Sequence, residues 1–296
     1  MKFCDFTSNL NHLKICQAAF PNLFLTKLAN SSKINHLELI GCFNITEIPK
    51  EFRDLKHLSV DVCSSFTDLS LKQLVLDHPN LTHLTLNGSP TITDESFAYI
   101  NTLKSLQYLH LGRALNGALN SVYCYKLRSP KIDIASLTHL DLSGTKNFSN
   151  SDLIYVTMYT NNLITLNVTG CDGISDLSLC FLIKKFENLQ NLHLSDTNVG
   201  DISMKMLGHY CTNLRILDLS GCHNVSSYMG HILSECPYLE KLNVPYCKNI
   251  SDDSFIFKEN AVFTCLKKLN LRNCDSITNN TLLNLLPRGK VLEFVR

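Results

Sequence analysis

Apolar residues recur along the chain in a short, fixed pattern. It is clearest in residues 163–188, where apolar or small residues hold relative positions 1, 4, 6, 9 and 12, namely Leu163, Leu166, Val168, Cys171 and Ile174. Alternate residues of a strand point to opposite faces, so positions 4 and 6 predict the buried face of a strand, and positions 3, 5 and 7 the other face. Ser175-Asp176 then precede an apolar run with helical spacing, which predicts a capped helix.

Copies of this unit fill the chain. They begin near Leu10, Ile34, Leu55, Leu81, Leu106, Leu137, Leu163, Leu189, Leu214, Leu239 and Leu266. One strand and one return segment cannot bury their apolar faces alone, so stacked copies share a continuous core. We therefore predict an α/β solenoid of about eleven repeats, a single horseshoe-shaped domain over residues 1–296. The parallel sheet lies on its concave face, the helices lie on its convex face, and residues 287–296 cap the C-terminal end.

Position 9 turns the chain out of each strand and is occupied by small residues. The column reads Ala18, Cys42, Cys63, Ser89, Ala114, Thr145, Cys171, Thr197, Cys222, Cys247 and Cys274. Buried cysteine usually behaves as a small hydrophobe, so we expect a structural role for this column in preference to a metal or redox role.

Two units break the rhythm. The unit from Ile34 has a short return segment that Pro49 truncates, so no full helix is expected there. The unit from Leu106 contains an irregular insertion over residues 112–136, which loses both the polar residue at position 9 and the helix cap. The insertion carries cationic and aromatic side chains of the kind that anchor partners, Arg113, Tyr123, Tyr125 and Arg128. The alternative is a tolerated surface loop whose tyrosines cover the core.

The pattern L-x-x-L-x-L-x-x-C-x-x-I-[ST]-D, seen from Leu239 to Asp252 after Cys236-Pro237, resembles the cysteine-containing subclass of leucine-rich repeats. That subclass is typical of the substrate-binding half of F-box and leucine-rich-repeat proteins, the receptors of cullin-type ubiquitin ligases. The resemblance implies ubiquitin-ligase components as partners. Only nine residues precede Leu10, so we expect no F-box in this chain. A stand-alone effector that an intracellular bacterium delivers into a host cell, where it binds a host protein, is the alternative.

The positions that the repeat leaves free form a polar surface on the predicted concave face. Position 3 is rich in histidine, and position 5 is mixed. The candidate partner-binding residues there are His12, His36, Glu38, His57, His83, Tyr108, His110, His139, Asp141, Asn167, His193, Asp218, Lys241, Lys268 and Arg272. Such a graded surface suits a protein partner better than a small molecule, which needs a deep apolar pocket. We expect any pH-dependent binding to appear as the histidines protonate in mildly acidic conditions.

The histidine column also invites a chemical interpretation. Metal ligands must converge, and a straight ladder of parallel side chains supplies this poorly, so we predict no metal and no cofactor. Asp141 with His139, and Asp218 with His193, are the candidate acid–base pairs. The sequence has neither a nucleophile-elbow, zincin nor phosphate-binding motif, so we predict a non-catalytic protein. A metal-dependent hydrolase that uses the histidine ladder is the alternative from another class.

Composition and charge indicate which partners and which cellular location to expect. The formal net charge of +1 gives no general attraction to nucleic acid or acidic membranes. No apolar run reaches the roughly 18 residues of a membrane span, and the N-terminal stretch lacks the features of a signal peptide. The 13 cysteines include no C-x-x-C pair, which favours a reduced, intracellular and cytoplasmic chain. We expect a monomer that binds a protein, with neither nucleic acid nor a membrane as partner.

Overall fold

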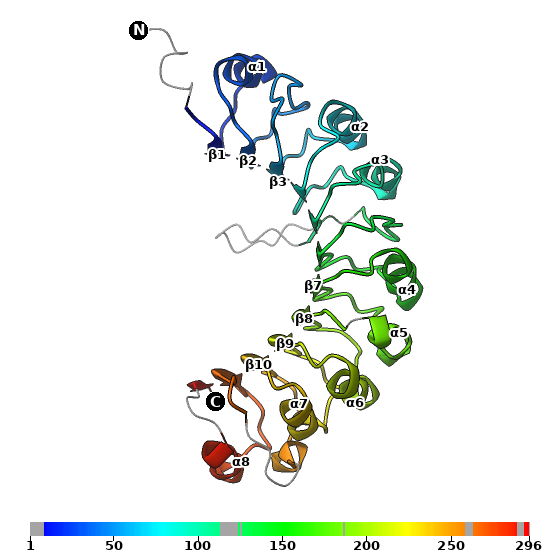
Figure 1. The fold of residues 1–296 in the computed structure, drawn as a ribbon, viewed down its shortest axis with the longest axis vertical. Helices are drawn as coiled ribbons and strands as arrows, with labels where there is room; N and C mark the ends of the chain where they lie inside the picture. Colours follow the sequence, from blue (N-terminus) through cyan, green and yellow to red (C-terminus); the bar gives the residue numbers. More distant parts are fainter. Residues whose placement is uncertain are drawn as a thin grey trace. The chain divides into compact units, whose positions relative to one another are not determined.

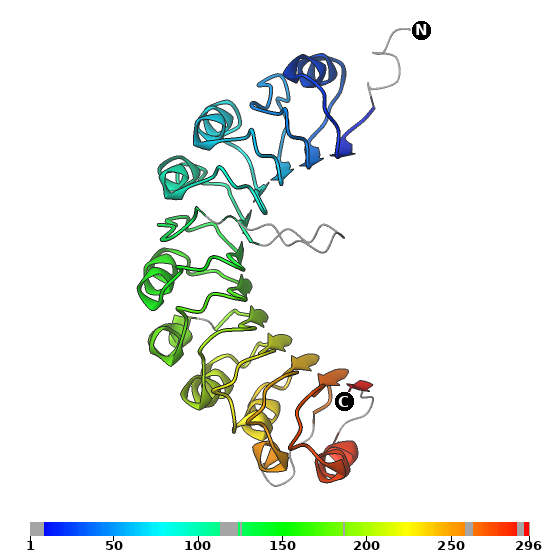
Figure 2. The same cartoon turned by 180° about the vertical axis from the view of Figure 1, so that it is seen from behind.

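The computed structural model describes residues 9–112, 124, 126–185, 187–257, 263–288 and 293–295. The chain divides into two compact units, Met1–Thr145 and Lys146–Arg296. In each unit, strands line one side and the return segments line the other (Figures 1 and 2). The α/β solenoid expected from the repeats is therefore confirmed, whereas the single domain of about eleven repeats stays a prediction.

The first unit contains six parallel strands that pair in chain order. Its strands are β1 (His12–Cys16), β2 (His36–Ile40), β3 (His57–Asp61), β4 (His83–Thr85), β5 (Tyr108–His110) and β6 (His139–Asp141). Its helices are α1 (Asn22–Ser31), α2 (Asp68–Asp77), the 3₁₀ turn η2 (Asp94–Ser96) and α3 (Phe97–Ile100). Pairing is in register throughout, so that position 3 of each repeat faces position 3 of the next.

The second unit repeats this arrangement with β7 to β12, which also pair in parallel and in chain order. Its strands are β7 (Thr165–Asn167), β8 (Asn191–His193), β9 (Ile216–Asp218), β10 (Lys241–Asn243), β11 (Lys268–Asn270) and β12 (Glu293–Val295). Its helices are α4 (Asn150–Tyr159), α5 (Asp176–Leu182), η3 (Ile183–Lys185), α6 (Asp201–Tyr210), α7 (Met229–Glu235), η4 (Asp252–Phe255), α8 (Asn279–Leu285) and η5 (Leu286–Arg288).

Every predicted repeat start is followed two residues later by a strand. The alternation within the strands is also as expected: in β2, Leu37 and Leu39 are fully buried, whereas His36, Glu38 and Ile40 are half-buried on the other side. We call the side that carries positions 3, 5 and 7 of β1 to β6 the strand face. Hydrophobic burial at positions 4 and 6 drives the stacking of the strands, and it leaves the strand face to polar side chains.

In every repeat whose position 8 the structure describes, the chain leaves the strand through a left-handed residue at that position. Glycine occupies this position in several repeats, with positive φ at Gly41, Gly88, Gly144, Gly170 and Gly221. Other repeats place a non-glycine residue there, and these also have positive φ: Gln17, Val62, Asp196, Tyr246 and Asn273. A β-branched residue such as Val62 rarely adopts this conformation, so the surrounding repeats must impose it.

The cysteine column is structural, because its thiols hydrogen-bond to the preceding repeat. The thiols of Cys222, Cys247 and Cys274 each donate to a position-6 carbonyl oxygen one repeat earlier, with S···O distances of 3.0, 3.1 and 3.1 Å. All described cysteines are free thiols. Burial raises the pKa of Cys63 and Cys247 to about 12, so both thiols stay protonated and able to donate.

The irregular repeat is less disrupted than the sequence suggested. Cys124 is 3% exposed and its thiol donates to the carbonyl oxygen of Leu86 at 3.2 Å, the position-6 carbonyl of the preceding repeat. Cys124 thus takes the place assigned to Ala114, and the expected loss of the position-9 residue was wrong. The backbone amide of Leu127 donates to Cys124 as Ile174 does to Cys171, so the repeat pattern resumes at Cys124.

The Ser/Thr-Asp pairs after the turns join one repeat to the next. The Thr67 and Ser149 side chains form capping boxes at α2 and α4, as expected. The aspartate of each pair has a further role: the Asp176 carboxylate accepts from the amides of Gly200 at 2.8 Å and Ser203 at 3.1 Å in the following repeat. Asp68 and Asp252 accept from the following repeat in the same way, and so does Asp201, although it follows Gly200.

No helix in the described part of the chain is long and apolar enough to cross a membrane.

Candidate functional site

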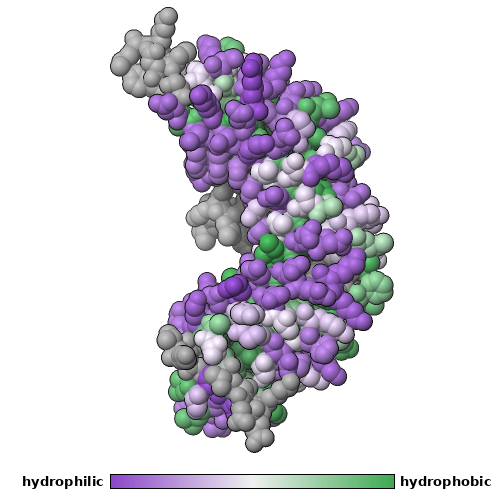
Figure 3. Space-filling view, viewed as in Figure 1, coloured by the Kyte–Doolittle hydropathy of each residue, from purple (hydrophilic) through white to green (hydrophobic). Residues whose placement is uncertain are grey.

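The strand face of the first unit carries a column of stacked rings, one from each repeat. We call this set the ring column: His12, His36, His57, His83, Tyr108 and His139. Successive ring centroids lie 3.8 to 5.0 Å apart, with interplanar angles of 8° to 26°. The spacing follows from the sheet, since neighbouring parallel strands lie about 4.8 Å apart and the register places each position 3 opposite the next. Hydrophilic side chains gather over the β1–β3 part of this unit (Figure 3).

Threonine hydroxyls fix the tautomer of two histidines in the column. The Thr82 hydroxyl lies 3.1 Å from the Lys56 carbonyl oxygen and 2.9 Å from His83 Nδ1. A hydroxyl has one proton, which goes to the carbonyl, so His83 Nδ1 must be the donor to the hydroxyl oxygen. Thr138 holds His139 in the same way, at 2.9 Å. Both imidazoles therefore keep a lone pair on Nε2 that can accept a hydrogen bond from a bound molecule.

The centre of the column stays uncharged over a wide pH range. Burial, and then the neighbouring histidines, lower the pKa of His83 to about 4. The pKa values of His57 and His139 are lowered for the same two reasons. Protonation of His83 thus falls below the mildly acidic range expected from the sequence. Around neutral pH, the imidazoles of His57, His83 and His139 are therefore uncharged.

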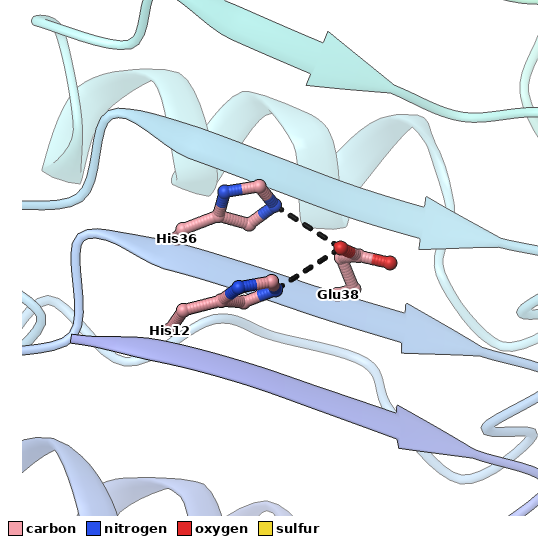
Figure 4. A group of neighbouring side chains, drawn as sticks. All are labelled: His12, His36 and Glu38. Atoms are coloured by element: carbon pink, nitrogen blue, oxygen red, sulfur yellow. Dashed lines mark hydrogen bonds and ion pairs between the residues drawn. The ribbon is translucent and has the colours of Figure 1, made fainter. Parts of the chain in front are cut away.

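Charge is concentrated at the β1–β2 end of the strand face. Glu38 Oε1 lies 3.1 Å from His12 Nε2 and 3.2 Å from His36 Nε2, and Oε2 lies 2.8 Å from Lys14 Nζ (Figure 4). Burial raises the pKa of Glu38, but hydrogen bonds from Lys14 and His12, together with the charges of Lys14 and His36, lower it by more, so this carboxylate stays ionised. The position-3 and position-5 side chains of two strands therefore converge here.

Asp61, at position 7 of β3, is a further ionisable group on this face. Burial raises the pKa of its carboxyl to about 6, although hydrogen bonds from Ser59 and from the amide of Asn87 oppose the shift. The register places His110 opposite Asp141 on the neighbouring strand. Burial lowers the pKa of His110 and the charge of Asp141 raises it. Asp141 Oδ1 also accepts from the Ser143 amide at 2.8 Å, which holds its carboxylate in place.

The candidates in the second unit have different surroundings. Asp218 lies opposite His193 in register and accepts from Ser195 Oγ at 2.8 Å, the Ser220 amide at 3.0 Å and Asn243 Nδ2 at 3.2 Å. The Asp218 carboxylate therefore already accepts hydrogen bonds from three neighbouring residues of the chain. The remaining candidates, Asn167, Lys241, Lys268 and Arg272, lie on or just after β7, β10 and β11, and Lys268 pairs with Glu293 at 2.8 Å.

Of the four candidates in the insertion, Arg113, Tyr123 and Tyr125 lie outside the described residues. Arg128 is exposed, and its backbone amide donates to Asp94 Oδ1 at 3.0 Å. In a regular repeat, the amide of the helix N-cap residue makes this same bond to the aspartate of the preceding repeat.

Sequence reasoning omitted Lys14 and Asp61 from the site. A signal existed for each, since Lys14 shares position 5 with Glu38 one repeat on, and position 7 of Asp61 also faces the polar side.

The repeat pattern and the parallel strand-and-return architecture define a leucine-rich-repeat solenoid. The model of the family described as "Leucine Rich repeats (2 copies)" matches residues 187–228. The structure is similar to that of yeast Rad7 in its complex with Elc1, with a TM-score of 0.61 and 16% identity over 95% of this chain and 81% of the other. This likeness concerns the fold.

Three curated proteins are similar in sequence. BTB/POZ domain-containing protein FBL11 of Arabidopsis thaliana is 30% identical over 64% of this chain and 22% of its own length. F-box/LRR-repeat protein 4 of Bos taurus is 27% identical, with coverage of 77% and 37%. DNA repair protein RAD7 of Saccharomyces cerevisiae is 26% identical, with coverage of 80% and 43%. The chain thus spans less than half the length of these relatives.

Proposed function

We propose that the strand face of the first unit recognises a protein partner, with the ring column at its centre. The observation that supports this most is the unbroken stack of six rings, five imidazoles and one phenol, flanked by ionisable groups. Aromatic side chains with a polar edge are enriched where proteins bind proteins, because they bury a large area and still offer hydrogen bonds. Neutral, stacked rings also lose little conformational freedom on binding.

The fixed tautomers give this surface a directional chemistry. His83 and His139 each retain an acceptor at Nε2, and Glu38 and Asp141 add carboxylate acceptors at the two ends of the column. Such a set of acceptors fits a partner segment rich in donors, such as lysine, arginine or asparagine side chains.

The finer form of the proposal is substrate recognition within a ubiquitin ligase. It is supported by the similarity to an F-box/LRR-repeat protein and to RAD7, whose solved structure is a complex with Elc1. Co-expression of the chain with Elc1 tests this form: a complex that survives gel filtration is expected. If the chain elutes free of Elc1 while RAD7 treated alike retains it, adaptor binding of this kind is excluded for the described repeats.

Recognition itself is tested by affinity capture with a matched pair of variants. The first replaces His83, Tyr108 and His139 by alanine in the ring column. The control replaces Lys72 and Gln73, two exposed residues of α2, by alanine. Thermal unfolding verifies that both variants fold. We expect proteins captured by the wild type and by the α2 control to be depleted at least 10-fold with the ring-column variant; equal capture by all three chains would contradict the proposal.

A further inference from the structure

The β1–β2 end of the strand face brings three metal-ligand atoms together. His12 and His36 face each other in register, and their rings stack with centroids 4.0 Å apart. Glu38 lies two residues after His36 on the same face of β2, and its side chain turns back so that Oε1 lies between the two imidazoles (Figure 4). His12 Nε2, His36 Nε2 and a Glu38 carboxylate oxygen all lie within 4.8 Å of one another.

The spacing of these atoms suits a small tetrahedral cation. Ligand atoms about 2.0–2.1 Å from a zinc ion are separated from one another by ~3.3 Å at the tetrahedral angle. The two Nε2···Oε1 distances, 3.1 and 3.2 Å, are already close to that value. The remaining Nε2···Nε2 separation can close by a side-chain rotation of His12, which is 53% exposed.

The two imidazole hydrogens that point at Glu38 mark the place that a cation would take. An ionised carboxylate only accepts hydrogen bonds, so both imidazoles direct Nε2–H toward Oε1. A cation seated between the three atoms takes the place of these two hydrogens, and each imidazole then carries its proton on Nδ1. The ligand set of two imidazoles and one carboxylate is typical of zinc and of similar transition ions, and it disfavours magnesium and calcium, which prefer oxygen.

We propose that His12, His36 and Glu38 bind one zinc ion through Nε2, Nε2 and Oε1. Lys14 Nζ lies 2.8 Å from Glu38 Oε2, so Oε1 is the carboxylate oxygen that faces the two imidazoles. The ammonium charge also opposes the cation, so Lys14 limits the affinity. With three ligands from the protein and side chains that are 20% to 53% exposed, a fourth position is open to water or to a group of another molecule.

Isothermal titration of zinc chloride into the full chain, stripped with EDTA and dialysed, tests the site. We expect one equivalent to bind, with affinity at least about 100-fold weaker for His12→Ala and His36→Ala and roughly 10- to 100-fold weaker for Glu38→Gln. His139→Ala removes a histidine from the far end of the same column and should bind as the wild type does. Cobalt(II) should show the intense visible absorption of a tetrahedral ion in the wild type and lose it in Glu38→Gln.

Two further variants keep the test decisive. Lys14→Met should bind zinc several-fold more tightly, a gain that misfolding cannot produce. Cys16→Ser removes the exposed thiol at the end of β1 and should leave binding unchanged. The proposal is overturned if the wild type binds no zinc at micromolar concentration, if His12→Ala and Glu38→Gln bind as the wild type does, or if Cys16→Ser abolishes binding. None of these readings depends on a protein partner.

Discussion

Replacing Asp61 by asparagine should stabilise the chain at neutral pH. The carboxyl of Asp61 is partly buried at position 7 of β3, and burial raises its pKa from 3.8 to about 6. The folded state therefore favours the protonated acid. The corresponding stability is fully present below about pH 4 and is lost as the pH rises through about 6. An asparagine carries no charge at any of these pH values and keeps an oxygen that can accept from the Asn87 amide, now 2.9 Å away.

The size of the effect follows from the shift. Two pKa units correspond to about 3 kcal/mol at 1.36 kcal/mol per unit. Because water reaches part of the carboxylate, we expect roughly 1–2 kcal/mol. Urea unfolding in the presence of EDTA, repeated at intervals from about pH 4 to pH 8, measures the difference between the variant and the wild type. The difference should be small at the acidic end, grow in favour of Asp61→Asn between about pH 4 and pH 6, and level off above about pH 6.

Glu38→Gln provides a control of opposite sign. The pKa of Glu38 is lowered, because hydrogen bonds from Lys14 and His12 and the charges of Lys14 and His36 together outweigh the effect of burial. Its charge therefore stabilises the fold above its unfolded pKa, and this stability is lost as the pH falls. Glu38→Gln should therefore destabilise the chain at neutral pH. If Asp61→Asn has a pH-independent effect, or destabilises more at pH 8 than at pH 4, the reasoning about the buried Asp61 carboxylate is refuted.

Three further predictions concern the bonds between repeats. Cys124→Ala should destabilise the chain by about 1–3 kcal/mol, because it removes a buried donor and leaves a small cavity, whereas Cys16→Ala should change little in the same urea titration. A thiol reagent should label Cys16 rapidly in the native chain and Cys124 only on unfolding, as peptide mapping of the labelled chain would show; rapid labelling of both contradicts the packing. Asp176→Ala should lower the free energy of unfolding by about 1–3 kcal/mol, because the backbone amides of the next repeat lose their acceptor. Asp172 is exposed, so Asp172→Ala serves as a control that should have almost no effect.

The strands and their polar face could be predicted because they depend on period alone. A burial period of two at positions 4 and 6, recurring at every repeat, fixes which residues face the core, and parallel pairing in register then places His36 beside His57 and His83 beside Tyr108. This prediction does not depend on the conformation of any side chain. Repeat spacing alone therefore sufficed to predict that the position-3 histidines lie next to one another.

The convergence at Glu38 could not be predicted in this way. A ladder of parallel side chains was the assumption, and it considers only position 3. The Glu38 side chain leaves position 5 and reaches back to two position-3 rings, because Oε1 gains two imidazole donors there and Oε2 gains Lys14. Rotamer choice of this kind depends on charge partners in neighbouring strands, which repeat spacing does not encode.

Cys124 illustrates a second limit. An insertion shifts the register of a repeat by an unknown number of residues, so counting from Leu106 assigned position 9 to Ala114. Packing fixes the register instead: Cys124 fills the buried turn below Leu86, and Leu127 follows three residues later, as in a regular repeat. The C-x-x-L sequence from Cys124 to Leu127 was the available signal. It matches the repeat once the intervening residues are treated as an excursion.

Histidine footprinting of the captured complex tests the recognition surface most directly. Diethyl pyrocarbonate modifies neutral imidazoles, and the centre of the ring column is neutral around pH 7. His57, His83 and His139 should be modified markedly more slowly in the complex than in the free chain, while exposed His223 in the second unit should react equally in both. Unchanged modification of the column, together with protection of exposed His209 on α6, would place the partner elsewhere and contradict the proposed role of the strand face.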